Sequence, residues 1–188
     1  LRTADPTFWE DRERAEAQMR KVKDLRKWIA YYDEADRLTE EVALALEYFK
    51  EGITSEEEVD EAYARAITLF EEVELKNMLR AEEDSLGAVL KINAGAGGTE
   101  SQDWASMLAR MYARYCDKQG YKTTITNWQD GEEAGIKTMT MQVEGDQAYG
   151  FLKSETGVHR LVRISPYNAQ GKRMTSFASV FVVPLVDD

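Results

Sequence analysis

The feature that most constrains the fold is a change of hydrophobic period close to Ser85–Leu86. Before it, apolar residues recur at steps of three and four, as on one face of a helix. After it, short runs alternate in the manner of strands. We therefore predict an α+β chain. An antiparallel helical hairpin or bundle spans 1–85, and an α/β domain with a mixed or antiparallel sheet and one prominent helix spans 86–188.

The first part carries signals for where its helices begin and end. Asp5-Pro6 places an N-cap before a proline at the first helical position. Gly52 ends the first long apolar repeat. Ser55, with Glu58 three residues later, forms a capping box that predicts the start of a second helix.

The second part is organised around a glycine-rich turn, Gly95–Gly98, which precedes a predicted helix over 100–119 that stops at Gly120. A turn is expected at Asp130-Gly131, and an irregular loop over 165–175. The remaining segments alternate as strands, with one short helix: strands over 88–93, 121–128, 136–143, 158–164 and 176–183, and the helix over 146–153.

Charge separates the two parts. Leu1–Leu86 holds 13 Lys/Arg and 24 Asp/Glu, a net charge of -11, whereas the remainder holds 11 of each. The first part is predicted to be an acidic arm that contacts protein. Between 153 and 173 the balance is positive, which suits either a phosphate-facing patch or a solvated basic loop. The cations of this stretch are Lys153, Arg160, Arg163, Lys172 and Arg173, against Glu155 alone.

The sequence lacks the residues that several classes of function require. No apolar run approaches membrane-spanning length and no signal segment opens the chain. The single cysteine, Cys116, lies in an apolar helical pattern and is expected to be buried, which favours the cytoplasm. The single histidine, His159, offers no His-based metal site. It has no recognisable nucleophile partner, so a structural histidine is expected and no catalytic residue is assigned.

The glycine-rich turn allows three interpretations. A nucleotide-binding loop is disfavoured, because Gly-Lys-Ser/Thr is absent, the glycine spacing is wrong for a dinucleotide fold and Glu100 would compete with a phosphate. A purely structural tight turn is the second interpretation. Recognition of a base by the backbone and Glu100 is the third.

The loop over 165–175 has the composition of an RNA-reading element, although composition alone is a weak signal. Pro166 stiffens it and Gly171 permits a turn. Ser165 and Thr175 supply hydroxyls for base edges, and Tyr167 can pack or stack on a base. Lys172 and Arg173 are predicted to contact phosphates.

Five runs together resemble the bacterial class I peptide chain release factors of type 2. They are Ala-Gly-Ala-Gly-Gly-Thr-Glu-Ser-Gln-Asp-Trp104, Gly-Glu-Glu-Ala-Gly-Ile-Lys137, Glu-Thr-Gly-Val-His-Arg-Leu-Val-Arg163, Lys-Arg-Met-Thr-Ser-Phe177 and Val-Asp-Asp188. The resemblance covers essentially the whole chain. It implies translation termination by reading UAA and UGA in the ribosomal A site.

The resemblance also implies site residues. The family's Ser-Pro-Phe tripeptide corresponds to Ser165, Pro166 and Tyr167, with the serine contacting the second codon base as A or G. The family's first-base contacts correspond to the backbone of Gly97 and to Glu100.

Two further positions follow on the next strand. Thr175 corresponds to the threonine that reads the third base. Met174 stands where the family usually has a histidine that stacks on the codon, and a thioether can still pack against a base.

The family's Gly-Gly-Gln loop, which promotes ester hydrolysis, lies downstream of Val-Asp-Asp and does not occur in this sequence. We expect a fragment of a longer protein, or else a natural short relative. In either case an exposed apolar surface or unpaired sheet edge is expected where the closing segment belongs. The resemblance implies a codon-specific factor rather than an enzyme, without cofactor or metal. It is expected to act as a cytoplasmic monomer that binds the ribosome, the mRNA stop codon and ribosomal RNA, with the arm on a ribosomal protein.

Two rival hypotheses remain open at this point. A non-releasing relative that binds RNA or stalled ribosomes is suggested by Tyr167, Met174 and the missing Gly-Gly-Gln. A nucleotide-dependent enzyme using Gly95–Gly98 is the third and weakest candidate.

Overall fold

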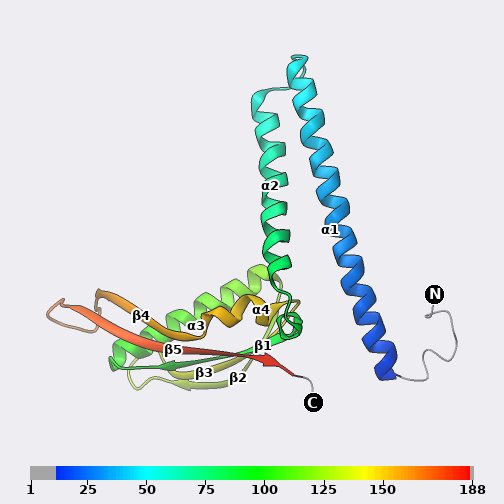
Figure 1. The fold of residues 1–188 in the computed structure, drawn as a ribbon. Coiled ribbons are helices and arrows are strands. Elements are labelled where there is room, and N and C mark those ends of the chain that lie inside the picture. Colours follow the sequence, from blue (N-terminus) through cyan, green and yellow to red (C-terminus); the bar gives the residue numbers. More distant parts are fainter. Residues whose placement is uncertain (1–11, 187–188) are drawn as a thin grey trace. The chain divides into compact units, whose positions relative to one another are not determined.

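The computed structural model describes residues 12–186 and divides into two compact units, Leu1–Met78 and Leu79–Asp188 (Figure 1). The predicted helix start at Asp5-Pro6 lies outside the described residues. The domain ranges 1–85 and 86–188 stay a prediction. None of the helices between residues 12 and 186 is both long and apolar enough to cross a membrane.

The first unit is a hairpin of two helices, α1 (Arg12–Lys50) and α2 (Glu56–Met78). The chain turns at Gly52, whose φ of 74° is a left-handed conformation that glycine adopts without strain. The capping box forms as predicted. The Glu58 amide donates to Ser55 Oγ, and the Ser55 amide donates to Glu58 Oε2, each at 3.3 Å.

Contacts across the hairpin show that its helices are antiparallel. Arg65 forms an ion pair with Glu41 near the turn. Farther from the turn, Lys76 Nζ donates to the Tyr31 hydroxyl at 2.5 Å. Residues at similar distances from the turn therefore meet, as in an αα-hairpin.

The second unit is built on a five-stranded sheet with the order β2-β3-β1-β5-β4, in which all neighbours are antiparallel. The strands are β1 (Gly87–Ala94), β2 (Lys122–Asp130), β3 (Ile136–Glu144), β4 (Gly157–Ile164) and β5 (Arg173–Leu185). The predicted α+β class is confirmed. The last strand begins before the predicted Ser176, because Arg173 and Met174 already pair with Ile164 and Arg163.

One face of the sheet forms the core of this unit and is covered by α3 (Thr99–Gln119) and α4 (Ala148–Leu152) (Figure 1). Alternate residues of the strands point into it, as the period of two requires. Cys116, on α3, is fully buried as predicted, and burial raises the pKa of its thiol to about 11. The buried strand residues include Ala88, Leu90, Ile92, Met139, Met141, Val143, Ala178, Val180 and Val182.

The opposite face of the sheet carries exposed apolar side chains. Phe177 and Phe181 alternate with the buried residues of β5 and are 36% and 55% exposed. Val158, paired with Ser179 on the neighbouring strand, is 71% exposed. The expectation of an exposed apolar surface or unpaired sheet edge where a closing segment belongs stays a prediction.

Two short 3-10 helices that the sequence did not predict hold the start of the second unit in place. They are η3 (Glu82–Ser85) and η4 (Lys153–Glu155). Asp84, only 2% exposed, accepts hydrogen bonds from the Ala81 amide at 3.1 Å and from Lys153 Nζ at 2.6 Å. The Tyr149 amide donates to the Leu86 carbonyl at 3.0 Å. These bonds make 79–86 part of the second unit.

Replacing Asp84 by alanine should lower the stability of the second unit by about 2 kcal/mol, because the Ala81 amide and the Lys153 ammonium lose their charged acceptor. Amide hydrogen exchange in β1 and β5 measures the loss. Glu144→Ala, which removes the exposed ion pair with Lys122, is the matched control and should leave this exchange unchanged. Equal protection of the β1 and β5 amides in both variants would contradict the stabilising role of Asp84.

Candidate nucleic-acid interface

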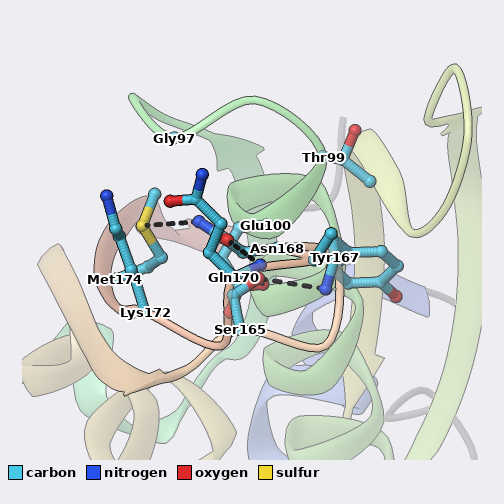
Figure 2. Close-up of a pocket in the computed structure, with 10 residues that line it drawn as sticks. Gly97, Thr99, Glu100, Ser165, Tyr167, Asn168, Gln170, Lys172 and Met174 are labelled. Carbon is cyan, nitrogen blue, oxygen red and sulfur yellow. Dashed lines mark hydrogen bonds between the residues drawn. The ribbon is translucent and has the colours of Figure 1, made fainter.

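A pocket of about 540 Å³ lies between the N-terminal turn of α3 and the loop that joins β4 to β5 (Figure 2). It brings together residues that the sequence singled out from segments more than sixty positions apart. Its lining residues are Gly97, Thr99, Glu100, Ser165, Tyr167, Asn168, Ala169, Gln170, Lys172 and Met174. Most of these present amide, hydroxyl, carboxylate or ammonium groups, so the lining suits a polar, hydrogen-bonding ligand.

The glycine-rich turn is fixed against β5. The Gly95 amide donates to the Phe177 carbonyl at 2.8 Å, and the Phe177 amide donates to the Ala96 carbonyl at 3.2 Å. Gly97 has a φ of 132°, and a Cβ there would lie 2.9 Å from the Cβ of Ser176. No side chain fits at Gly97 without a shift, so its exposed backbone is open to close approach by a ligand.

Glu100, in the first turn of α3, is a buried carboxylate with two side-chain donors. It is 5% exposed and accepts from Arg163 Nε at 2.5 Å and from Ser165 Oγ at 2.6 Å. The hydrogen bond from Arg163 holds the pKa of Glu100 below its usual range, against the opposing effect of burial, and the bond from Ser165 assists. Glu100 is therefore kept ionised.

Arg163 links β4 to two successive positions on one face of α3. Besides Glu100 it donates from Nη2 to Asp103 Oδ2 at 2.6 Å, and Nη1 lies 3.6 Å from Met107 Sδ. The two carboxylates raise the pKa of Arg163. Sequence analysis overlooked Asp103. Its place one turn after Glu100 on the same helical face is the signal that could have found it.

The loop after β4 is built from two consecutive turns. The Asn168 amide donates to the Ser165 carbonyl at 3.4 Å, with Pro166 at the second position of this turn. The Gly171 amide then donates to the Asn168 carbonyl at 2.9 Å. Ser165 is 5% exposed, and its Oγ accepts from the Tyr167 amide at 3.1 Å. The predicted stiff loop is thus held by its own backbone.

The Asn168 side chain ties the loop to β5, a role that the sequence did not reveal. Its Oδ1 accepts from the Gln170 amide at 2.9 Å, and its Nδ2 donates to Met174 Sδ at 3.7 Å (Figure 2). Met174 is 37% exposed and lines the pocket, as does Tyr167, which is 47% exposed. Both side chains therefore remain available to a ligand.

Thr175 lies beside the pocket but not among its lining residues. It pairs with Val162, and because strand residues alternate it points to the face opposite Met174. A ligand that touches both Ser165 and Thr175 must therefore pass around β5.

The five predicted phosphate contacts have different surroundings. Lys172 lines the pocket, and Arg173 follows it at the start of β5. Arg160 is exposed and pairs with Phe177. Lys153 and Arg163 instead form ion pairs with carboxylates. The phosphate contacts stay a prediction for all five.

His159 has the structural surroundings that the sequence predicted. Its Nε2 donates to the Glu155 carbonyl at 2.9 Å, and its own carbonyl accepts from Trp104 Nε1 at 3.0 Å. The Glu155 carboxylate accepts from the Tyr112 hydroxyl at 2.7 Å. This cluster fastens β4 to α3.

Arg163→Met should destabilise the second unit by about 3 kcal/mol at about pH 7, because Glu100 would be left buried and ionised. The difference in free energy of unfolding from the unchanged chain should shrink as the pH falls to about 4, where the Glu100 carboxyl of the variant becomes protonated. Urea denaturation at the two pH values measures both. The exposed Arg37, which binds Glu34 and Glu41, supplies the control: Arg37→Met should show no such pH dependence. A loss of stability in Arg163→Met that does not depend on pH would contradict the pairing of Arg163 with an ionised Glu100.

The sequence matches the PCRF domain family over residues 1–180. Peptide chain release factor 2 of Roseobacter denitrificans is 46% identical over 192 residues, which cover 100% of this chain and 50% of the relative. The protein of the same name from Helicobacter pylori (strain P12) is 46% identical over 190 residues, covering 98% and 51%.

Among solved structures, "RF2 of Thermus thermophilus" aligns with a TM-score of 0.65 and 38% identity, over 97% of this chain and 52% of that one. The chain thus spans about half the length of the relatives it matches. The PCRF domain family matches residues 1–180, and the similarity to these release factors extends over the whole of this chain. The chain therefore belongs to the PCRF domain family of peptide chain release factors.

Proposed function

We propose that the second unit of this chain reads the stop codons UAA and UGA in the ribosomal A site, and that the chain serves translation termination. The observation that carries the proposal is the hydrogen-bonded set Ser165–Glu100–Arg163 at the wall of the pocket. It provides one hydroxyl that can change its role while the charges behind it stay paired. The release factors to which the chain is similar support the same function.

The Ser165 hydroxyl suits a position where either purine is accepted. It has one hydrogen, which it gives to Glu100, and two lone pairs, one of which accepts from the Tyr167 amide. The free lone pair can accept from the amino group of adenine. For guanine, whose O6 is an acceptor, the hydroxyl rotates its hydrogen from Glu100 to the base. Glu100 keeps its bond to Arg163 in both states.

The rest of the triplet is assigned to the neighbouring groups. The first base meets the backbone of Gly97, where no side chain intervenes, and the start of α3 at Glu100. Tyr167 and Met174 supply exposed apolar surface on which bases can pack. Thr175 points to the face of β5 opposite Met174. We therefore assign it the third base, which in this proposal is not stacked on the first two.

The phosphates of the RNA are assigned to the cations on and near the loop. Lys172, at the pocket, and the neighbouring Arg173 are the primary candidates. Arg160 is the third, on the outer face of β4. Lys153 and Arg163 contribute only if RNA competes with their carboxylates.

The α1–α2 hairpin is proposed to contact a ribosomal protein. Residues 12–78, which form the hairpin, hold 11 Lys/Arg and 18 Asp/Glu, and this net charge of -7 favours a basic protein surface over RNA. In this proposal the chain acts in the cytoplasm as a monomer that recognises the codon. None of its residues is assigned to ester hydrolysis.

Ser165→Ala should reduce codon selectivity about tenfold, because the adaptable hydroxyl is lost while the Glu100–Arg163 pair remains. The measurement is the affinity of the chain for ribosomes carrying UAA, UGA or UCA in the A site, since UCA differs from both stop codons at the second base alone.

Ser154→Ala, at an exposed serine of η4, is the control and should keep the selectivity of the unchanged chain. Equal affinity of the unchanged chain for UGA and UCA would refute the proposed function. Unaltered selectivity in Ser165→Ala would refute the role of the hydroxyl.

A further inference from the structure

The loop that joins β2 to β3 packs against the first turn of α3 more closely than side chains allow. Gly135 has a φ of 67°, and a Cβ built there would lie 2.1 Å from the Gln102 carbonyl oxygen and 2.5 Å from the Asp103 amide nitrogen. Such distances leave room for a hydrogen atom only. Backbone therefore meets backbone at this contact, and the loop supports the helix directly.

Hydrogen bonds fix the same loop on the helix. Gln102 Oε1 accepts from the Glu132 amide at 3.2 Å, and the Gly131 amide donates to the Gly135 carbonyl at 2.9 Å, which closes the loop. Glu133 Oε2 accepts from the Thr99 hydroxyl at 3.1 Å. The loop thus contacts three of the first five residues of α3, namely Thr99, Gln102 and Asp103.

These contacts are made to the first turn of α3, where Thr99 and Glu100 line the pocket. Glu100 and Asp103 bind Arg163, while Gln102 and Thr99 bind the β2–β3 loop. The first turn of α3 is therefore held by two elements that are distant in sequence.

Thr99 connects the loop to the pocket itself. It is one of the lining residues (Figure 2). Its only hydroxyl hydrogen is donated to Glu133 Oε2. The lone pairs of the hydroxyl are all that it can offer a ligand. In this state Thr99 accepts hydrogen bonds and does not donate them.

We propose that the Gly131–Gly135 loop positions the part of the pocket that meets the first codon base. Gly135 sets the place of the α3 turn, and Glu133 makes Thr99 an acceptor for a donor group of that base. Gly135 and Glu133 are positioning residues that touch no RNA. The inference rests on the proposed codon-reading function.

The first test compares two glycines of matched conformation. Gly135→Ala and Gly120→Ala each place a methyl group at a left-handed residue, with φ of 67° and 70°, near opposite ends of α3. A Cβ at Gly120 has nothing within 4 Å. Affinity is measured for ribosomes carrying UGA, CGA, which differs at the first base, or UCA, which differs at the second.

Gly135→Ala should lower the preference for UGA over CGA about tenfold or more, while Gly120→Ala keeps it. A general loss of stability would weaken binding to all three codons alike and leave the ratios unchanged, which would overturn the inference. The UGA-to-UCA ratio should fall less than the UGA-to-CGA ratio.

A second variant keeps the test decisive if Gly135→Ala does not fold. Glu133 is exposed, so Glu133→Ala should fold normally and lower the UGA-to-CGA ratio about threefold to tenfold, the worth of one hydrogen bond. Glu144→Ala, at the far end of the same hairpin, is its control. In a Thr99→Val background the Glu133 substitution should have no further effect.

Different results would contradict the proposed function and the positioning role of the loop. If the unchanged chain binds UGA, CGA and UCA equally, the proposed function is wrong. If it selects UGA but Glu133→Ala behaves as Glu144→Ala does, the function stands and the positioning role of the loop is wrong.

Discussion

The pocket at the start of α3 depends on the guanidinium of Arg163 lying between two carboxylates of one helix. Glu100 is nearly inaccessible to water, and a charge in that position persists only with a close counter-charge. Arg163 provides it from the end of β4, and Ser165 follows two residues later. The ion pair therefore fixes the distance between the helix tip and the loop, and the pocket between them takes its width from this contact.

Around this ion pair, hydrogen bonds hold the backbone of the glycine turn and of the loop after β4. The glycine turn is bonded to β5, the loop is made of two closed turns, and Asn168 joins the loop to Met174. The Ser165 hydroxyl can turn its hydrogen from Glu100 to a ligand by exchanging one charge-assisted hydrogen bond for another contact. In the proposed function, the pocket keeps its shape for both purines and only the direction of the Ser165 hydrogen bond changes.

Much of the fold was predictable, since periodicity and capping are local signals. The capping box at Ser55 and the buried Cys116 were confirmed, as was the antiparallel sheet. The internal partners in the site were not predictable. Arg163 lies 63 positions from Glu100, and Thr99 lies 34 from Glu133. From the sequence, Arg163 is simply one cation of a basic stretch, and only the fold shows that Glu100 and Asp103 pair with it.

The solitary thiol of this chain has a practical consequence. Cys116 has no exposed surface, its pKa is raised to about 11, and it sits where α3 faces the sheet. An alkylating reagent requires both access and the thiolate, so it can react only during openings that separate this helix from the strands. The rate of labelling thus reports how often α3 separates from the sheet, without any engineered probe.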